Sequence, residues 1–332
     1  MQFENLHHSL VLVPLALGLA ACGGGGGSDD GGIGTGTVSV SITDAAVDSA
    51  EKVLVQFTGI TVKPSEGEAQ AIALSGDSQT CQQYLEGETS PTAPGEPTIR
   101  CIELKALQGT ETANLLNNVT LTAGKYNWMR LDVDAERGAM DSIIEVNTGE
   151  LYSLYVPSGG QSGLKLNSGF TVLAGGSHNF VIDFDLRKSV NNPKGFEDYR
   201  LIPSLRLMDL AESGNIVGAV DAALLTANAC SGAVNTGDGF AVYVYQGGAG
   251  TIIGEEGSVN APLTSASVNW EADANQWRYT VGFLAPGEYT VAFTCQAGDD
   301  SAEDPANGIE FVESEGSPIA VVADQDSVVN FP

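Results

Sequence analysis

Apolar and polar residues alternate in short runs along most of the chain. The segments "TVSVSIT" (37–43), "NWMRLDVDA" (127–135) and "HNFVIDFDL" (178–186) have this period-two pattern, which predicts half-buried β-strands. Gly, Pro, Asn and Asp separate the runs at spacings of about 10 residues, which leaves no room for crossover helices and favours antiparallel pairing. The pattern therefore predicts an all-β fold.

The same kind of strand continues toward the C-terminus, as in "GFAVYVYQG" (239–247) and "QWRYTVGFL" (276–284). The longer run "KVLVQFTGITVKP" (52–64) has the length of one bent strand or of a tight hairpin. A short helix is expected only over residues 104–118, "LKALQGTETANLLNN".

A small motif recurs in the two halves of the chain. "LTAGKY" (121–126) and "LAPGEY" (284–289) align leucine, a small residue, glycine and tyrosine in the same register. We expect the glycine to supply a positive φ in a turn, and the tyrosine to begin the next strand and pack inward.

The first residues have the features of an export signal. The apolar run 10–21 is too short for a membrane span, which needs roughly 20 residues, so residues 1–21 are predicted to be a signal peptide. The run ends in Leu19-Ala20-Ala21-Cys22, which resembles the lipobox of bacterial lipoproteins and predicts lipidation of Cys22. One departure is that residues 1–9 contain no Lys or Arg.

The glycine-rich segment 22–36 is predicted to be a flexible tether between the lipid anchor and the first strand. Gly23 stands where inner-membrane lipoproteins of enteric bacteria have aspartate, so the resemblance implies the outer membrane of a Gram-negative cell. The membrane face that carries the protein stays open.

Charge narrows the range of partners. The 332 residues include 42 acidic and 14 basic side chains, a net charge of −28 that repels nucleic-acid phosphates and anionic lipid surfaces. Cations, neutral polymers and basic protein patches remain as plausible partners. Thirteen basic residues precede residue 211 and only Arg278 follows, which predicts two β-sandwich domains, 37–210 and 213–332.

Four cysteines follow Cys22, and an exported chain with an even number of cysteines is expected to form disulfides. Three pairings are possible in principle. The domain boundary selects Cys81–Cys101 and Cys230–Cys295, one bond in each domain. Zinc is the alternative, but there is no CxxC spacing to support it.

The first domain resembles a known family. The segments 38–62, 121–135 and 180–190, closing on "YRLIPSLRLMD" (199–209), are similar to the domain-of-unknown-function family 4382 of bacterial envelope lipoproteins, over residues 37–210. Ala46, where the family commonly has proline, and the inserted loop 75–101 depart from it. The resemblance implies a fold and a location, but no activity.

The second domain resembles a broader class. "LAPGEYTVAF" (284–293) is similar to the strand-turn-strand of carboxypeptidase-regulatory-like and transthyretin-like Ig-type sandwiches, and the likeness covers residues 213–332.

Candidate chemistry is sparse. His178 is the only histidine after the signal peptide, and neither a G-x-S-x-G nor an HExxH motif is present, so we predict no enzyme activity and no cofactor. Aspartates alternate on two strands, Asp132 with Asp134 and Asp183 with Asp185, facing solvent or an inter-domain groove. They are either calcium ligands or structural carboxylates paired with arginines at 130 and 187.

Trp270 and Trp277 flank the polar turn "EADANQ" (271–276). They are predicted to form either a platform that stacks on carbohydrate or a cross-strand pair of a hairpin.

Together these features favour a non-catalytic lipoprotein of the cell envelope with a binding or adhesion role. Its expected partners are the membrane, through the lipid anchor, and an envelope protein or polysaccharide, but no nucleic acid. A carbohydrate-active or polymer-processing accessory protein and a structural spacer in a surface complex are the alternatives.

Overall fold

The computed structural model describes residues 34–45, 50–157, 163–193, 195–226, 239–300, 308–314 and 318–332, together with residues 230, 237 and 302. Ile33–Pro332 forms one compact unit. The predicted signal peptide, Cys22, Ala46 and most of the tether lie outside the described residues. Among the helices of the described part, none has the length and apolar character needed to span a membrane.

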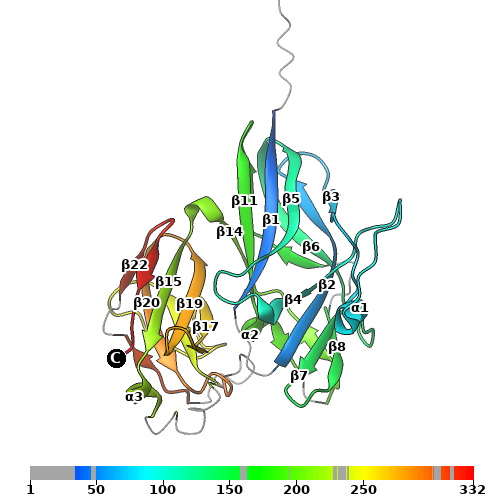
Figure 1. The fold of residues 1–332 in the computed structure, drawn as a ribbon. Helices are drawn as coiled ribbons and strands as arrows, with labels where there is room; N and C mark the ends of the chain where they lie inside the picture. Colours follow the sequence, from blue (N-terminus) through cyan, green and yellow to red (C-terminus); the bar gives the residue numbers. More distant parts are fainter. Residues whose placement is uncertain are drawn as a thin grey trace, which may run out of the picture. The chain divides into compact units, whose positions relative to one another are not determined.

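The strands up to residue 209 form two sheets. The smaller contains β1 (Thr35–Ala45), β5 (Ala113–Thr122), β11 (Ser177–Asp185) and β14 (Leu205–Asp209). The order of its described strands is β14-β11-β1-β5, and Figure 1 shows β1 in dark blue beside β11 in green. Because β1 is an interior strand, both its edges are hydrogen-bonded, in parallel to β11 and antiparallel to β5.

A single long strand, β2 (Ala50–Pro64), organises the larger sheet. It pairs with four strands, β3 (Gln70–Ala73), β4 (Arg100–Glu103), β6 (Gly124–Asp134) and β7 (Ile143–Val146). The remaining described strands of this sheet are β8 (Leu151–Tyr155), β9 (Leu164–Leu166), β10 (Phe170–Val172), β12 (Val190–Asn191) and β13 (Tyr199–Leu201).

The strands from residue 214 onward form two further sheets. One has the order β18-β19-β15-β23 and contains β15 (Gly214–Val220), β18 (Asn269–Glu271), β19 (Gln276–Leu284) and β23 (Asp326–Val328). The other contains β16 (Ala241–Gln246), β17 (Thr264–Ser267), β20 (Gly287–Thr294), β21 (Val312–Glu313) and β22 (Ile319–Val321).

Helical segments in the described residues are short. They are α1 (Cys81–Glu86), η1 (Leu104–Ala106), α2 (Leu186–Ser189), η3 (Leu210–Glu212) and α3 (Ala222–Leu225). α1 begins with a reciprocal capping box, in which Thr80 accepts from the Gln83 backbone and Gln83 from that of Thr80. It ends at Gly87, whose φ of 71° is accessible to glycine without strain.

Each pair of sheets encloses an apolar core. Phe57, Ile60 and Phe184 are fully buried in the first core, and Phe240 and Ile216 in the second. The predicted all-β sandwich class is therefore confirmed. The division into separate domains 37–210 and 213–332 stays a prediction, because both cores belong to one compact unit.

Two details differ from the sequence-based expectation. β1 pairs in parallel with β11, β15 with β23, and β8 with β13, although most pairs are antiparallel. These partners are distant in the chain, so long connections through other strands replace the helical crossovers that neighbouring parallel strands need. The helix expected over 104–118 is limited to η1, and β5 begins at Ala113 within the remainder.

The tyrosine of the recurring leucine–glycine–tyrosine motif has the same role in both halves, but the glycine does not. Gly124 has the expected positive φ, of 149°, whereas Gly287 does not, so the prediction was wrong for the second copy. Tyr126 and Tyr289 are buried near the starts of β6 and β20, as predicted. In addition, the hydroxyl of Tyr126 donates to the Thr122 carbonyl oxygen at 2.9 Å, and that of Tyr289 to the Ala285 carbonyl at 2.8 Å. Each tyrosine thus fixes the turn that precedes its own strand.

Both predicted disulfides are confirmed. Cys81 is bonded to Cys101 and Cys230 to Cys295. The first bond joins α1 to β4, so it ties the inserted loop to the larger sheet next to β2. The second joins residue 230 to the end of β20.

Candidate functional site

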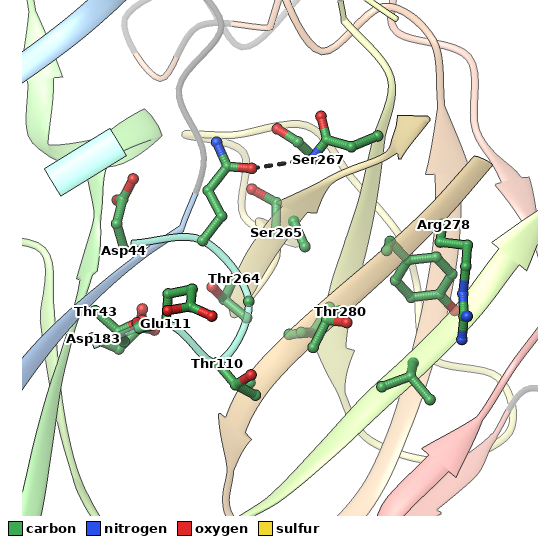
Figure 2. A pocket seen from close by; sticks show the side chains of 18 of the residues that line it. Thr43, Asp44, Thr110, Glu111, Asp183, Thr264, Ser265, Ser267, Arg278 and Thr280 are labelled. Carbon is green, nitrogen blue, oxygen red and sulfur yellow. Dashed lines mark hydrogen bonds between the residues drawn. The ribbon is translucent and has the colours of Figure 1, made fainter. Parts of the chain in front are cut away.

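A polar pocket with a volume of about 570 Å³ lies among segments that are far apart in the sequence (Figure 2). We call it the junction pocket. Its lining comes from the end of β1, the loop 108–111, β11, β14, β15, β17, β18, β19 and β23. The residues that line the pocket include Thr43, Asp44, Gln108, Gly109, Thr110, Glu111, Asp183, Arg206, Thr264, Ser265, Ser267, Trp270, Glu271, Arg278, Thr280, Gly282 and Asp326.

The loop 108–111 is attached to β1 by hydrogen bonds. The Thr43 hydroxyl lies 2.9 Å from the Leu107 carbonyl oxygen and 2.8 Å from that of Glu111. The backbone N–H of Asp44 also donates to the Leu107 carbonyl, at 3.0 Å. These contacts place the Thr110 and Glu111 side chains at the pocket.

The other side of the loop packs closely on β19. A Cβ added at Gly282 would lie 2.2 Å from the Gly109 carbonyl oxygen, so only glycine permits this approach. The amide of Asn269 also donates to the Gln108 side-chain oxygen at 3.2 Å. The loop therefore bridges β1 and the sheet that contains β19.

Several pocket side chains have unused hydrogen-bonding capacity. Within the described part of the chain, the side chains of Thr110, Glu111, Thr264, Ser267 and Thr280 make no hydrogen bond. Figure 2 shows them on the loop, on β17 and on β19. The pocket thus offers donors and acceptors in several directions to a ligand.

Asp183, one of the predicted calcium candidates, lines this pocket but is paired. Its carboxylate accepts from Arg206 of β14, which is its direct neighbour in the sheet register. Burial raises the pKa of Asp183, Arg206 offsets part of this rise, and the negative charge of Asp185 adds to it.

The sequence predicts that Arg187 pairs with Asp183 and Asp185, and this prediction is wrong. The chain leaves the strand after Asp185 and turns through α2, and the Asp185 side chain accepts from the Lys188 backbone. The turn breaks the alternation and directs Arg187 elsewhere. The aspartates at 183 and 185 are also 4% and 3% exposed, so neither faces open solvent.

α2 inserts two cations beside β17. The Arg187 guanidinium donates to the Ser265 hydroxyl at 2.7 Å and lies 5.2 Å from the centre of the Tyr243 ring. The Lys188 ammonium donates to Asp185 at 2.8 Å and to the carbonyl oxygens of residues 262 and 263 at 2.8 and 3.2 Å. This group of contacts, which we call the α2 anchor, joins β11 to the segment around β17.

Glu256 completes the α2 anchor and is fully buried. Its carboxylate lies 3.6 Å from the Lys188 ammonium and has no hydrogen-bond partner within the described residues. Burial raises the pKa of Glu256 to about 8, with a further contribution from the negative charge of Asp185 that Lys188 partly offsets. The carboxyl therefore keeps its proton at neutral pH.

Asp44 is a second buried carboxyl without a hydrogen bond to its oxygens in the described part of the structure. Burial raises the pKa of Asp44 well above its ordinary value, and Asp183 and Asp185 raise it further. The surroundings of Asp44 thus favour its protonated form more than water does.

The other two calcium candidates lie on β6, in the larger sheet. Asp132 accepts from Arg130 at 2.6 Å, the ion pair expected from the sequence, and from Thr61 at 2.7 Å. Asp134 accepts from the Gln56 amide at 3.1 Å. The four aspartates are thus on two different sheets. Among the described residues, no three acidic, histidine or cysteine side chains are grouped as metal ligands.

Trp270 and Trp277 face each other across β18 and β19 as a cross-strand pair. Their ring centres are 5.6 Å apart and the planes are inclined by 65°, so the rings do not form one flat platform. Trp277 packs against Phe240 of the core, whereas Trp270 is 49% exposed and lines the junction pocket.

A family model, the domain of unknown function DUF4382, matches residues 35–203. The chain belongs to this family. The expectation drawn from the N-terminal strands is therefore confirmed. The DUF4382 segment supplies Thr43, Asp44, the loop 108–111 and Asp183 to the pocket, whereas β17 and β19 lie beyond it. The likeness of residues 213–332 to transthyretin-like sandwiches stays a prediction.

Several solved structures show a distant likeness. A leucine-rich repeat protein from Bacteroides thetaiotaomicron has 13% identity and a TM-score of 0.21; the match covers 90% of this chain but only 26% of that one. A candidate cell-adhesion protein from Bacteroides fragilis has 9% identity and a TM-score of 0.20, with 88% and 92% covered. The fimbrial anchor protein Mfa2 from Porphyromonas gingivalis has 10% identity and a TM-score of 0.17, with 80% and 79% covered.

At these TM-scores the likenesses support no statement about the function of the DUF4382 chain. No curated protein sequence matches it.

Sequence reasoning missed the pocket residues Thr110, Glu111, Thr264 and Thr280. Each is a common polar residue in an unremarkable context, and the pocket is formed only when the loop 108–111 contacts β19. A signal for Arg206 was present, since "LRLMD" (205–209) alternates like a strand, but its partner depends on sheet order.

We expect Asp183→Asn to lower the free energy of unfolding by about 3 kcal/mol, because it leaves Arg206 without its partner in a largely buried site. An ion pair on an exposed surface would contribute only about 1 kcal/mol or less. Urea denaturation measures the loss. Asp132→Asn is the matched control, since the Arg130–Asp132 pair is more exposed and should contribute less than about 1 kcal/mol.

Calcium should not change the melting temperature of either variant or of the unaltered protein. A rise in melting temperature with millimolar calcium over chelator, lost in Asp183→Asn, would contradict the structural role of this carboxylate.

Glu256→Gln should flatten the pH dependence of stability. The folded chain keeps a proton on Glu256 up to a pKa of about 8, whereas the unfolded chain releases it near the ordinary value of 4.5. Stability is therefore lost as pH rises through this window, by about 1.4 kcal/mol per pH unit from this group. Glutamine stays neutral at every pH. The free energy of unfolding of the variant should therefore rise relative to that of the unaltered protein between pH 5 and 8, with about the same slope. Equal slopes in urea denaturation of both proteins would refute this assignment.

Proposed function

We propose that this protein is a non-catalytic binding protein of the cell envelope that takes its ligand in the junction pocket. The observation that carries this proposal is the set of polar side chains that line the pocket without a hydrogen bond within the described residues. Protein interiors normally satisfy such groups internally, whereas binding sites leave a few of them available to a ligand.

The chemistry of the lining supports binding more than catalysis. Nucleophilic catalysis needs an activating base next to the nucleophile, most often histidine. His178 does not line the pocket; its ring nitrogen Nε2 accepts from the Leu173 backbone at 2.9 Å. No cysteine or lysine is among the described residues that line the pocket.

A carbohydrate-active role is the second candidate, because the pKa values of two lining carboxyls, Asp44 and Asp183, are raised. Their surroundings oppose a role in acid–base catalysis. Asp183 is held by Arg206, and each oxygen of Asp44 is buried from solvent. A structural spacer is the third candidate, and the open side chains of the pocket argue against it.

The envelope location rests on the sequence. Leu19-Ala20-Ala21-Cys22 is similar to a lipobox, and two or three acyl chains on Cys22 hold a protein stably at a membrane surface. The glycine-rich segment that follows is suited to a tether. We place the anchor in the outer membrane of a Gram-negative cell, with an envelope polysaccharide or protein as the partner.

Immobilised full-length protein should retain labelled envelope polysaccharide or envelope protein, and the retained polymer should elute with its length unchanged. Ser267→Tyr puts a bulky ring in the pocket and should reduce retention at least about fivefold by steric clash. Val259→Tyr is the matched control, because Val259 is 99% exposed and does not line the pocket.

Three outcomes would reject the proposal in different ways. Shortened polymer in the eluate would show an enzyme. Equal retention by Ser267→Tyr would place binding outside the pocket, and no retention of either fraction would leave the structural spacer.

Cys22→Ala should remove the acylation site and move the protein from the membrane fraction to the soluble fraction. Gly23→Ala is the control and should leave the protein in the membrane fraction. Fractionation followed by immunoblotting measures both. Membrane association of Cys22→Ala equal to that of the unaltered protein would refute lipid anchoring.

A further inference from the structure

We propose that the ligand of the junction pocket is a neutral saccharide, bound by hydroxyl side chains inside the pocket and by Trp270 beside them. This ligand class deepens the proposed binding function and rests on it. Three observations support it: the kind of side chain that is open, the exposed tryptophan, and the way in which the charged side chains are already used.

The open groups are mainly hydroxyls. Thr110, Thr264, Ser267 and Thr280 line the pocket and have no side-chain hydrogen bond among the described residues. A hydroxyl both donates and accepts, which is the same capacity that a sugar hydroxyl has. A polyhydroxylated ligand can therefore satisfy these groups, whereas an apolar ligand would leave them buried without partners.

The open hydroxyls also lie on different walls. Figure 2 shows Thr110 on the loop, Thr264 and Ser267 on β17, and Thr280 on β19. A saccharide carries hydroxyls around its ring and so presents polar groups to several walls at once. The pocket volume of about 570 Å³ lies in the usual range for small-ligand sites.

Trp270 adds an aromatic surface to the polar lining. It is 49% exposed, and Trp277 contacts it edge to face, with the planes inclined by 65°. Aromatic rings of this kind pack against the C–H faces of sugar rings, which are less polar than their edges. A single exposed aromatic is common on protein surfaces, but this one also belongs to the lining of the pocket.

The charged side chains favour a neutral ligand. Arg206 is paired with Asp183 and Arg278 with Glu271, so the charge of each cation is already balanced by a carboxylate of the pocket. The net charge of −28 also repels polyanions.

A basic peptide is the main competing ligand. It is disfavoured because most carboxylates of the pocket already have partners. Asp183 and Glu271 have cationic partners, and Asp326 accepts from the Asn215 amide at 2.8 Å. Both oxygens of Asp44 are buried. Apart from the buried Asp44, Glu111 is therefore the one lining carboxylate in the described structure without a hydrogen-bond or ion-pair partner, next to four open hydroxyls.

The test is titration of the full-length protein, in micelles of a sugar-free detergent, with maltohexaose, cellohexaose, mannohexaose, N-acetylchitohexaose and hexalysine. Isothermal titration calorimetry gives Kd, and tryptophan emission reports whether the surroundings of Trp270 change when the ligand binds. We expect saturable binding of at least one saccharide, weakened about tenfold in Trp270→Ala and about threefold to tenfold in Thr280→Val.

Trp128→Ala is the matched control. Trp128 packs with the Lys165 ammonium on the larger sheet and is not part of the pocket lining, so its removal should leave Kd unchanged. Thr280→Val keeps the side-chain shape and removes only the hydroxyl, which provides a second variant if Trp270→Ala does not fold.

Absence of binding by all four saccharides would overturn the inference, and so would a Kd that is the same in Trp270→Ala and Thr280→Val. Binding of hexalysine without any saccharide would overturn the ligand class but leave the proposed binding function standing. That function fails separately, through the retention and polymer-length experiment with Ser267→Tyr.

Discussion

The hydrogen bonds of the Lys188 ammonium hold together two segments that line the junction pocket. The ammonium donates to Asp185 at the end of β11 and to two carbonyl oxygens that precede β17. Arg187 adds a second contact to β17 through Ser265. This α2 anchor thus joins the DUF4382 strands to β17 through charged side chains, and it holds the wall of the junction pocket that β17 forms.

Burying so many ionisable groups costs free energy. Some of these groups are stabilised by ion pairs, and others by keeping a proton. Asp183 has an arginine partner. Burial raises the pKa of Glu256 to about 8, so this carboxyl stays protonated at neutral pH, and burial also raises the pKa of Asp44. A buried carboxylate without a full set of partners would otherwise cost several kcal/mol. The strongly acidic composition therefore coexists with a packed junction, because part of its charge is removed by folding.

The junction pocket combines this rigid frame with unused polar groups. Close packing of Gly109 on Gly282 brings the loop to β19, and the Thr43 hydroxyl attaches the same loop to β1. A pocket whose walls are fixed before binding needs little ordering when a ligand enters, which lowers the entropic cost of binding. Binding by preformed polar walls is the behaviour we infer for this DUF4382 chain.

The amino-acid sequence by itself determined the strand-rich fold, the disulfides Cys81–Cys101 and Cys230–Cys295, the family, and the Arg130–Asp132 pair, because each depends on alternation, spacing or neighbours within one strand. Only the tertiary structure decided that Asp183 pairs with Arg206, since that partner depends on which strand lies beside β11. It also decided that both faces of β11 are buried from Phe180 to Asp185, which alternation does not predict. The pocket itself depends on contacts between residues more than a hundred positions apart, such as Gly109 and Gly282, and no local pattern encodes such contacts.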